Sequence, residues 1–82
     1  ATVRQLAAEP WVVRERGSGT RDATDRWLAS RLSSMRIELE LGSSEAIKRV
    51  VGGGIGLGCL SRLTVADELA QGTLVEVRTT LP

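Results

Sequence analysis

Hydroxyl side chains and glycines at two predicted helix starts are the residues of this 82-residue chain with the clearest chemical potential. One group comprises Ser18, Gly19 and Thr20, and the other comprises Gly42, Ser43 and Ser44. Serine and threonine oxygens accept hydrogen bonds from the free amides of a first helical turn, and the same amides bind anions. These loops therefore indicate either plain helix caps or the walls of a site for a small anionic or carboxylate-bearing molecule.

The chain has few residues that are suited to catalysis. The chain has no histidine and one cysteine, Cys59, which stands in a predicted strand where a free cysteine is usually a small buried apolar residue. The carboxylates fall on predicted solvent-facing sides, so neither a nucleophile with its general base nor a set of metal ligands assembles. We therefore expect a protein that is not an enzyme, with no catalytic residues, no metal and no cofactor.

The glycine-rich segment 52–58 has a structural interpretation. A dinucleotide-binding fingerprint stands between a strand and the helix that follows it, whereas these glycines follow a predicted helix and enter a strand. Gly56 and Gly58 alternate with apolar residues, which predicts a strand face without side chains on which another element packs closely. A valine at Gly56 is expected to destabilise the fold by roughly 2 kcal/mol or more, by overpacking a helix on that strand.

Apolar spacing predicts the elements around these loops. Residues 11–13 form a short strand, and residues 21–32 form a helix in which Ala23, Trp27, Leu28 and Leu32 share one face. Arg21 and Asp25 lie elsewhere on this helix, and Arg21 is expected to pair either with a ligand anion or, more commonly, with Asp25 one turn on. Residues 36–41 alternate between apolar and charged, which is typical of a strand with one covered face. Residues 45–51 form a second amphipathic helix, and residues 55–59 form a third strand.

Two successive strand-helix-strand units predict a parallel sheet, because each crossover is long enough for a helix and right-handed. With helices on both faces, the strand near residue 12 lies between those near residues 39 and 57, a small doubly wound α/β fold. Ligands bind at the carboxyl ends of such strands. Loops 17–21, 42–44 and 60–62 should meet there.

The two ends of the chain carry weaker signals. Leu6 and Ala7 fit a short helical turn before Pro10. Thr64 with Asp67 resembles a capping box for a helix over residues 63–69 that Gly72 ends. Residues 74–77 alternate as a last strand, at an edge of the sheet.

Size and charge limit the class of protein. Eighty-two residues make one small domain, and a net charge of +1 with both signs interspersed argues against a nucleic-acid footprint. The sequence has neither an apolar run long enough to span a membrane nor a signal peptide, which predicts a cytoplasmic protein. The chain opens at Ala1 without a methionine, so we expect residues 1–82 to be a fragment.

Taken together, these motifs resemble a known family. Residues 11–21, residues 44–51 and the run 54–62 that ends in Leu-Ser-Arg look like the effector-binding region of LysR-type transcriptional regulators. The resemblance covers about residues 10–77. Members have an N-terminal winged helix-turn-helix, a linker helix and an effector domain of two lobes similar to type 2 periplasmic binding proteins. This chain is similar to the second lobe only, so the DNA-binding part and the first lobe would be absent.

The resemblance implies a sensor. A small metabolite would bind in the cleft between lobes and change how the oligomer contacts promoter DNA. By position, Ser18, Gly19 and Thr20 would line the cleft at one helix start, and Gly42, Ser43 and Ser44 at the other. Ser61 stands where many relatives have proline, and this version looks like a branch associated with sulfur metabolism, which favours a small oxyanion.

The resemblance also implies self-association as a homodimer or tetramer. Effector domains of the family pair antiparallel, and the matching elements here are residues 21–32 and 36–41, with interface candidates Arg21, Asp25, Leu28, Glu38 and Glu40. The two glutamates fit edge protection of a strand equally well. Two other readings remain open at this stage: a lobe of an extracytoplasmic solute-binding protein for a small oxyanion, and an oligomerisation module without a ligand.

Overall fold

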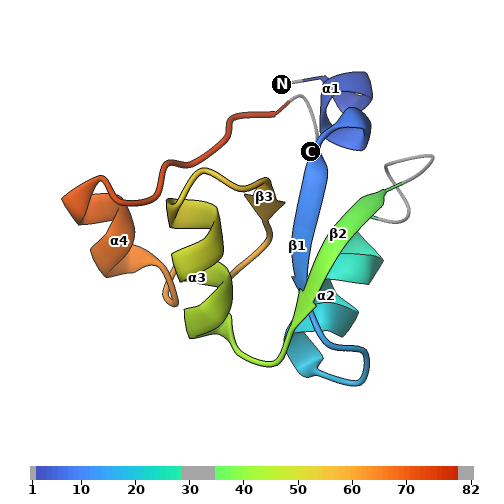
Figure 1. Ribbon diagram of the computed structural model, residues 1–82, viewed down its shortest axis with the longest axis horizontal. Coiled ribbons are helices and arrows are strands. Elements are labelled where there is room, and N and C mark those ends of the chain that lie inside the picture. The colour runs from blue at the N-terminus through green and yellow to red at the C-terminus, as the bar shows by residue number, and fades with distance from the viewer. Residues whose placement is uncertain (1, 29–34, 80–82) are drawn as a thin grey trace.

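The computed structural model describes residues 2–28 and 35–79, which form four helices and three strands (Figure 1). The helices are α1 (Val3–Ala8), α2 (Gly19–Leu28), α3 (Ser44–Gly52) and α4 (Ala66–Gln71). The strands are β1 (Pro10–Arg14), β2 (Arg36–Leu41) and β3 (Leu57–Gly58). Strands and helices alternate from β1 to α4, as the apolar spacing predicted.

The sheet has the order β2-β1-β3, and both pairs are parallel. The predicted order and direction are therefore confirmed, with β1 in the centre. Trp11 pairs with Ile37 and Val12 with Leu39, so Glu38 is an extra residue that makes a bulge in β2. The third strand is short, because only Leu57 and Gly58 pair with β1.

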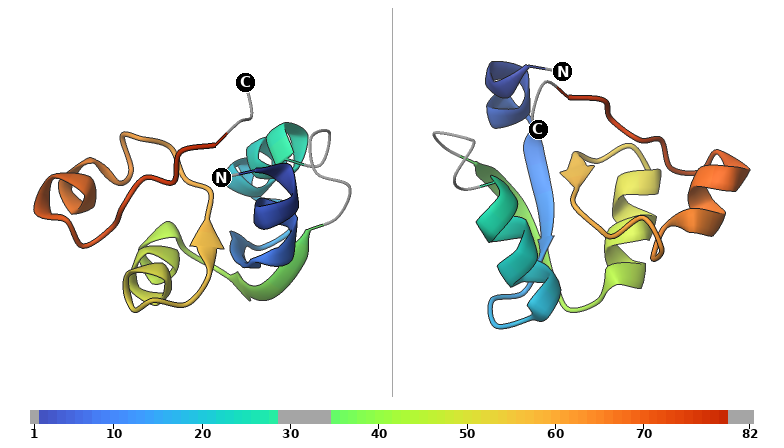
Figure 2. Two further views of the ribbon diagram at one scale, coloured as in Figure 1. Left: turned by 90° about the horizontal axis from the view of Figure 1, so that it is seen from above. Right: turned by 180° about the vertical axis from the view of Figure 1, so that it is seen from behind.

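Helices cover both faces of β1, and α2 and α3 lie on opposite sides of it (Figure 2). Trp11 and Val13 form a buried cluster with Leu6 and Leu28, and the Trp11 indole donates a 2.9 Å hydrogen bond to the Leu6 carbonyl. Val12, which is fully buried, faces the other way because side chains alternate along a strand. That second face is covered by α3, whose Ile47 is buried.

The predicted buried face of the first long helix is wrong in part. Leu28 is buried, but Trp27 is 37% exposed and Ala23 is also exposed. The charged Arg21 is instead only 4% exposed. Its guanidinium donates to the Arg14 carbonyl at 3.0 Å and pairs with Asp25 at 3.0 Å. These two partners offset the desolvation cost of the buried charge. The predicted continuation to Leu32 lies outside the described residues.

The predicted covered face of β2 is also wrong. Ile37 is 43% exposed and Leu39 38% exposed, although they alternate with charged residues. Both α2 and α3 pack mainly on the central strand β1, so the apolar side chains of this edge strand stay in contact with solvent.

Predictions at the two ends have mixed outcomes. The turn at Leu6 and Ala7 is part of α1, and Gly72 ends α4 with a left-handed φ of 79°. The capping box is wrong, because α4 starts after Val65 without a side-chain cap and the Thr64 hydroxyl bonds to Ser61 instead. Residues 74–77 form no strand.

Two glycines allow close approach, for different reasons. A Cβ on Gly58 would lie 3.2 Å from Ile47 and 3.3 Å from Val51, so the predicted close packing of a helix on this strand is confirmed there. At Gly56, φ is +68° and a Cβ would lie 2.5 Å from the Pro10 carbonyl oxygen. The expected cost of a side chain at Gly56 therefore comes from the backbone of β1 and from φ, and the helix is not its cause.

Replacing Gly56 by alanine should destabilise the chain more than the same change at Gly54. Both glycines have positive φ, but a Cβ at Gly54 meets no atom within 4 Å. Gly54→Ala should cost about 1–2 kcal/mol from φ alone, and Gly56→Ala at least about 1 kcal/mol more from the clash with Pro10. Urea unfolding of the two variants measures the difference. Equal losses would show that the Pro10 carbonyl does not limit this position.

Candidate functional site

The three predicted loops meet at one cavity of about 460 Å³. Both α2 and α3 begin at the carboxyl end of β1 (Figure 1). The lining residues come from the start of α2, the start of α3 and the segment after β3: Gly19, Thr20, Ala23, Thr24, Trp27, Ser44, Cys59, Leu60, Ser61 and Thr64. Parallel strands thus bring polar side chains that are far apart in the sequence, such as Thr20 and Thr64, to one open cleft.

The predicted site residues divide into two groups. Gly19, Thr20, Ser44 and Ser61 line the cavity, whereas Ser18, Gly42 and Ser43 do not. The Ser18 hydroxyl accepts a 2.9 Å bond from the Arg21 amide, and the Ser43 hydroxyl accepts a 3.1 Å bond from the Ala46 amide. Ser18 and Ser43 are therefore helix caps, and the residues just after them face the cavity.

The Ser44 hydroxyl is hydrogen-bonded to the side chain of an arginine. The hydroxyl accepts a 3.3 Å hydrogen bond from Nη1 of Arg14, the last residue of β1. Arg14 also pairs with Glu15, Nε to Oε1 at 2.8 Å. That hydrogen bond holds the pKa of the Glu15 carboxyl below its ordinary value.

Thr24 and Cys59 form a less polar part of the wall. The Thr24 hydroxyl donates to the Thr20 carbonyl at 2.9 Å, and Thr24 is buried. Burial raises the pKa of the Cys59 thiol, and the hydrogen bond with Thr24 opposes this with a smaller effect. A neutral thiol is a poor nucleophile. Cys59 is half-buried, and its structural role stays a prediction.

Thr64 is a lining residue that the sequence did not indicate. Its hydroxyl lies 2.7 Å from the Ser61 hydroxyl, and its amide donates to the Ser61 carbonyl at 3.1 Å. The two residues thus close a turn that presents both side chains to the cavity. The nearest signal was its spacing from Asp67, which suggested a helix cap.

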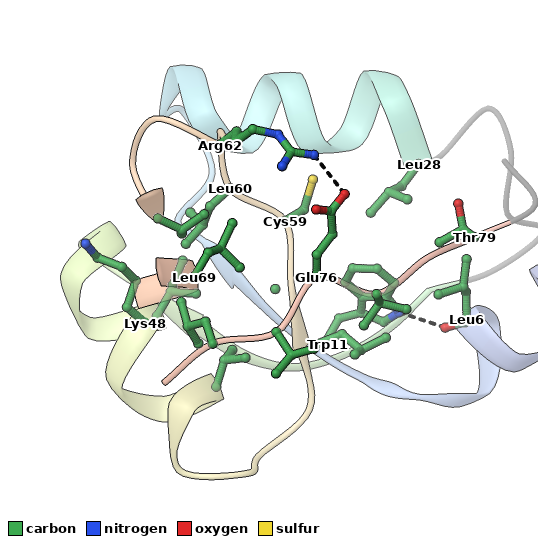
Figure 3. Close-up of a pocket in the computed structure, with 18 of the residues that line it drawn as sticks. Leu6, Trp11, Leu28, Lys48, Cys59, Leu60, Arg62, Leu69, Glu76 and Thr79 are labelled. Atoms are coloured by element: carbon green, nitrogen blue, oxygen red, sulfur yellow. Dashed lines mark hydrogen bonds and ion pairs between the residues drawn. The ribbon is translucent and has the colours of Figure 1, made fainter. Parts of the chain in front are cut away.

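A second, mainly apolar cavity of about 300 Å³ lies between the sheet, α3, α4 and residues 74–79. Figure 3 shows Trp11, Leu28, Leu60 and Leu69 around it, with the ion pair of Arg62 and Glu76, 2.8 Å long, at its edge. Its wall shares Trp27, Cys59 and Leu60 with the first cavity. The two cations in the wall of the second cavity, Lys48 and Arg62, are each paired with a carboxylate, Glu68 and Glu76 respectively.

The candidate interface residues differ in accessibility. Leu28 and Arg21 are buried within the fold, so their side chains are not presented at the surface. Glu40 accepts from the Arg16 amide at 3.1 Å and Glu38 pairs with Arg36 at 3.0 Å, while Asp25 pairs with Arg21. A role of Asp25, Glu38 and Glu40 between copies of the chain stays a prediction.

The described part of the chain has neither a candidate metal site nor a helix that could span a membrane. Residues 2–28 and 35–79 contain no cluster of three acidic, cysteine or histidine side chains that could hold a metal ion. None of the described helices is sufficiently long and apolar to cross a membrane.

The chain is similar to bacterial transcription regulators. It is 53% identical over 81 residues to the HTH-type transcriptional regulator YeiE of Escherichia coli (strain K12), covering 99% of this chain and 28% of that protein. It is 40% identical over 73 residues to the HTH-type transcriptional activator CmpR of Synechocystis sp., covering 89% of this chain and 24% of that protein. It is 42% identical over 70 residues to a RuBisCO operon transcriptional regulator of Acidithiobacillus ferrooxidans, covering 85% and 23%.

The chain thus spans about a quarter of the length of these curated relatives. The model of the LysR substrate binding domain matches residues 1–82, the whole chain. A parallel sheet with helix starts around one cleft agrees with that match, and the chain belongs to the LysR substrate-binding domain family.

Proposed function

We propose that this chain is the second lobe of the effector-binding domain of a LysR-type transcriptional regulator, and that it binds a small metabolite or anion. The observation that carries the proposal is the convergence of hydroxyl groups from Thr20, Ser44, Ser61 and Thr64 on one cavity. These residues belong to three separate segments: the start of α2, the start of α3 and the turn after β3. A need for helix caps alone would not bring them together, since Ser18 and Ser43 already provide the caps.

The chemistry of the wall favours a negatively charged ligand. The starts of α2 and α3 both border the cavity, and free amides at helix starts carry partial positive charge. Arg14 contacts the Ser44 hydroxyl, and its charge is partly offset by the ion pair with Glu15. The lining residues include no aspartate or glutamate, so nothing in this wall repels an oxyanion.

Regulation would follow from closure of this wall on an opposing lobe outside these 82 residues. A ligand that binds both walls stabilises the closed form by its difference in affinity for the two forms. In the full-length protein, closure would change how a cytoplasmic homodimer or tetramer contacts promoter DNA through another segment. The similar proteins are named as transcription regulators, which favours this function over a transport lobe.

Neighbouring serines at the start of α3 should respond differently to alanine. Ser43→Ala removes the hydroxyl that accepts from the Ala46 amide and should lower the free energy of unfolding by about 1 kcal/mol. Ser44→Ala removes a longer, partly exposed bond with Arg14 and should cost less than about 0.5 kcal/mol. Denaturant unfolding compares the two. A larger loss at Ser44 would contradict the assignment of Ser43 as the cap.

Anion binding should depend on the cavity residues. We expect titration of the full-length protein with sulfate to shift the amide signals of Thr20 and Ser44. Thr20→Val and Ser44→Ala should each weaken sulfate binding about tenfold or more, since a hydrogen bond to a charged group contributes about 1.5–3 kcal/mol. Ser43→Ala is the matched control and should leave the affinity within about twofold, because a cap contributes to folding and not to this cavity.

Two results would count against the proposed function. One is the absence of amide shifts at Thr20, Ser44 and Ser61 with sulfate, phosphate and small carboxylates. The other is an equal loss of affinity in the Ser43 and Ser44 variants, which would mean that helix stability, and not contact with the ligand, controls binding.

A further inference from the structure

Lys48 has an unusual environment for a lysine at the surface of a small domain. It lies on α3, and its side chain is only 9% exposed. Its Nζ atom lies 3.0 Å from Glu45 Oε1, 3.1 Å from Glu68 Oε2 and 3.0 Å from the Thr64 carbonyl oxygen. An ammonium group has three donors, so all three are used.

The three acceptors connect parts of the chain that the sheet does not join. Glu45 lies on α3 itself, and Glu68 lies on α4. Thr64 closes the turn that presents Ser61 to the candidate site. Ser44 is four residues before Lys48, so both are on the same face of α3. Lys48 thus joins the helix that carries one wall of the cavity to the turn that forms another.

The Lys48 side chain does not line the candidate site. It borders the apolar cavity, where Figure 3 shows it near Leu69 of α4. An effect of Lys48 on a ligand in the site would therefore pass through Thr64 and Ser61. The ammonium is a cation on a long stem, so its loss would remove both a hydrogen bond to the turn and the charge between two carboxylates.

Lys48 and Glu68 are both in their charged forms around neutral pH. Hydrogen bonds with Glu45 and then Glu68 raise the pKa of Lys48, and the hydrogen bond with Lys48 lowers the pKa of Glu68. The other carboxylate oxygen of Glu68 is buried without a hydrogen-bond partner among the described residues. Without Lys48, the Glu68 carboxylate would lose its cation, and the contacts that hold α4 and the turn against α3 would be lost.

We infer that Lys48 is a positioning residue of the effector site, whose ammonium holds the Ser61–Thr64 turn against α3 at the spacing that lets Ser44 and Ser61 reach one ligand. The inference rests on the proposed function for its ligand, but the placement of the turn is a separate claim that holds without any ligand.

Lys48→Met in the full-length protein tests both parts, with Arg49→Met as the matched control. Arg49 is the exposed neighbour on the same helix, so both variants lose one positive charge. In the absence of anion, only Lys48→Met should shift the amide signals of Ser61 and Thr64. It should also weaken sulfate binding about three- to tenfold, the equivalent of one hydrogen bond, while Arg49→Met leaves the affinity unchanged.

Two further variants separate the contacts. Lys48→Arg keeps the charge and should restore most of the sulfate affinity. Glu68→Gln keeps the bond from Lys48 to the Thr64 carbonyl and should leave the affinity within about twofold. Should Lys48→Met fail to fold, Lys48→Gln is the second variant, because its amide is neutral but polar, and it removes the charge while keeping a shorter hydrogen-bond donor.

The outcomes are distinguishable. Equal losses in Lys48→Met and Arg49→Met would overturn the inference in favour of long-range charge, and a loss in Glu68→Gln as large as in Lys48→Met would overturn the role of the Thr64 bond. Unchanged amide signals at Ser61 and Thr64 would overturn it as well. If wild-type protein binds no anion while those signals still move in Lys48→Met alone, the proposed function fails and the placement of the turn by Lys48 is supported.

Discussion

Parallel pairing of β1 with both of its neighbours is the constraint on which the rest of the structure depends. A parallel strand must be reached by a crossover, so each strand of this sheet delivers its loop to the same edge. Val12 at the centre of β1 is fully buried, with α2 on one side and α3 on the other. The helices that start at that edge therefore start close together, and their polar first turns share one cavity.

At this edge, each helix start has two hydroxyl residues close together in the sequence, one that caps the helix and one that lines the cavity. Successive residues of a helix are rotated by about 100°, so a capping serine and its neighbour point in different directions. Ser43 turns back to the Ala46 amide, while Ser44 meets Arg14 and the cavity. Ser18 and Thr20 repeat this division at the start of α2. Each helix start thus has one hydroxyl for its own stability and another available for a ligand.

Local patterns predicted the features that depend on local physics. Strand order, the cap of α3 and the end of α4 at Gly72 follow from chain direction, hydroxyl position and glycine conformation. Burial of Arg21 could not be predicted in this way, because its carbonyl acceptor at Arg14 comes from β1. Periodicity also shows which residues of β2 share a face, but it does not show whether another element packs on that face.

In the candidate site, too, the sequence predicted the residues whose position depends on local structure and missed the one that depends on distant contacts. Thr20 and Ser44 were found because helix starts after parallel strands have a known direction. Thr64 was missed because its place depends on two distant or non-helical contacts, the ammonium of Lys48 and the hydroxyl of Ser61. Such contacts leave no periodic signal in a sequence.

The third wall of the cleft differs physically from the other two. Helices α2 and α3 pack on opposite faces of the sheet through the buried Leu28 and Ile47, and Arg21 also joins the first turns of α2 to the Arg14 carbonyl of β1. The segment after β3 leaves the sheet after a two-residue strand, so no ladder of backbone hydrogen bonds fixes residues 61–64 to it. Polar contacts replace that ladder: Ser61 closes the turn, and Lys48 attaches it to α3. Such contacts depend on charge and geometry, so this wall is the one most easily displaced without unfolding the sheet.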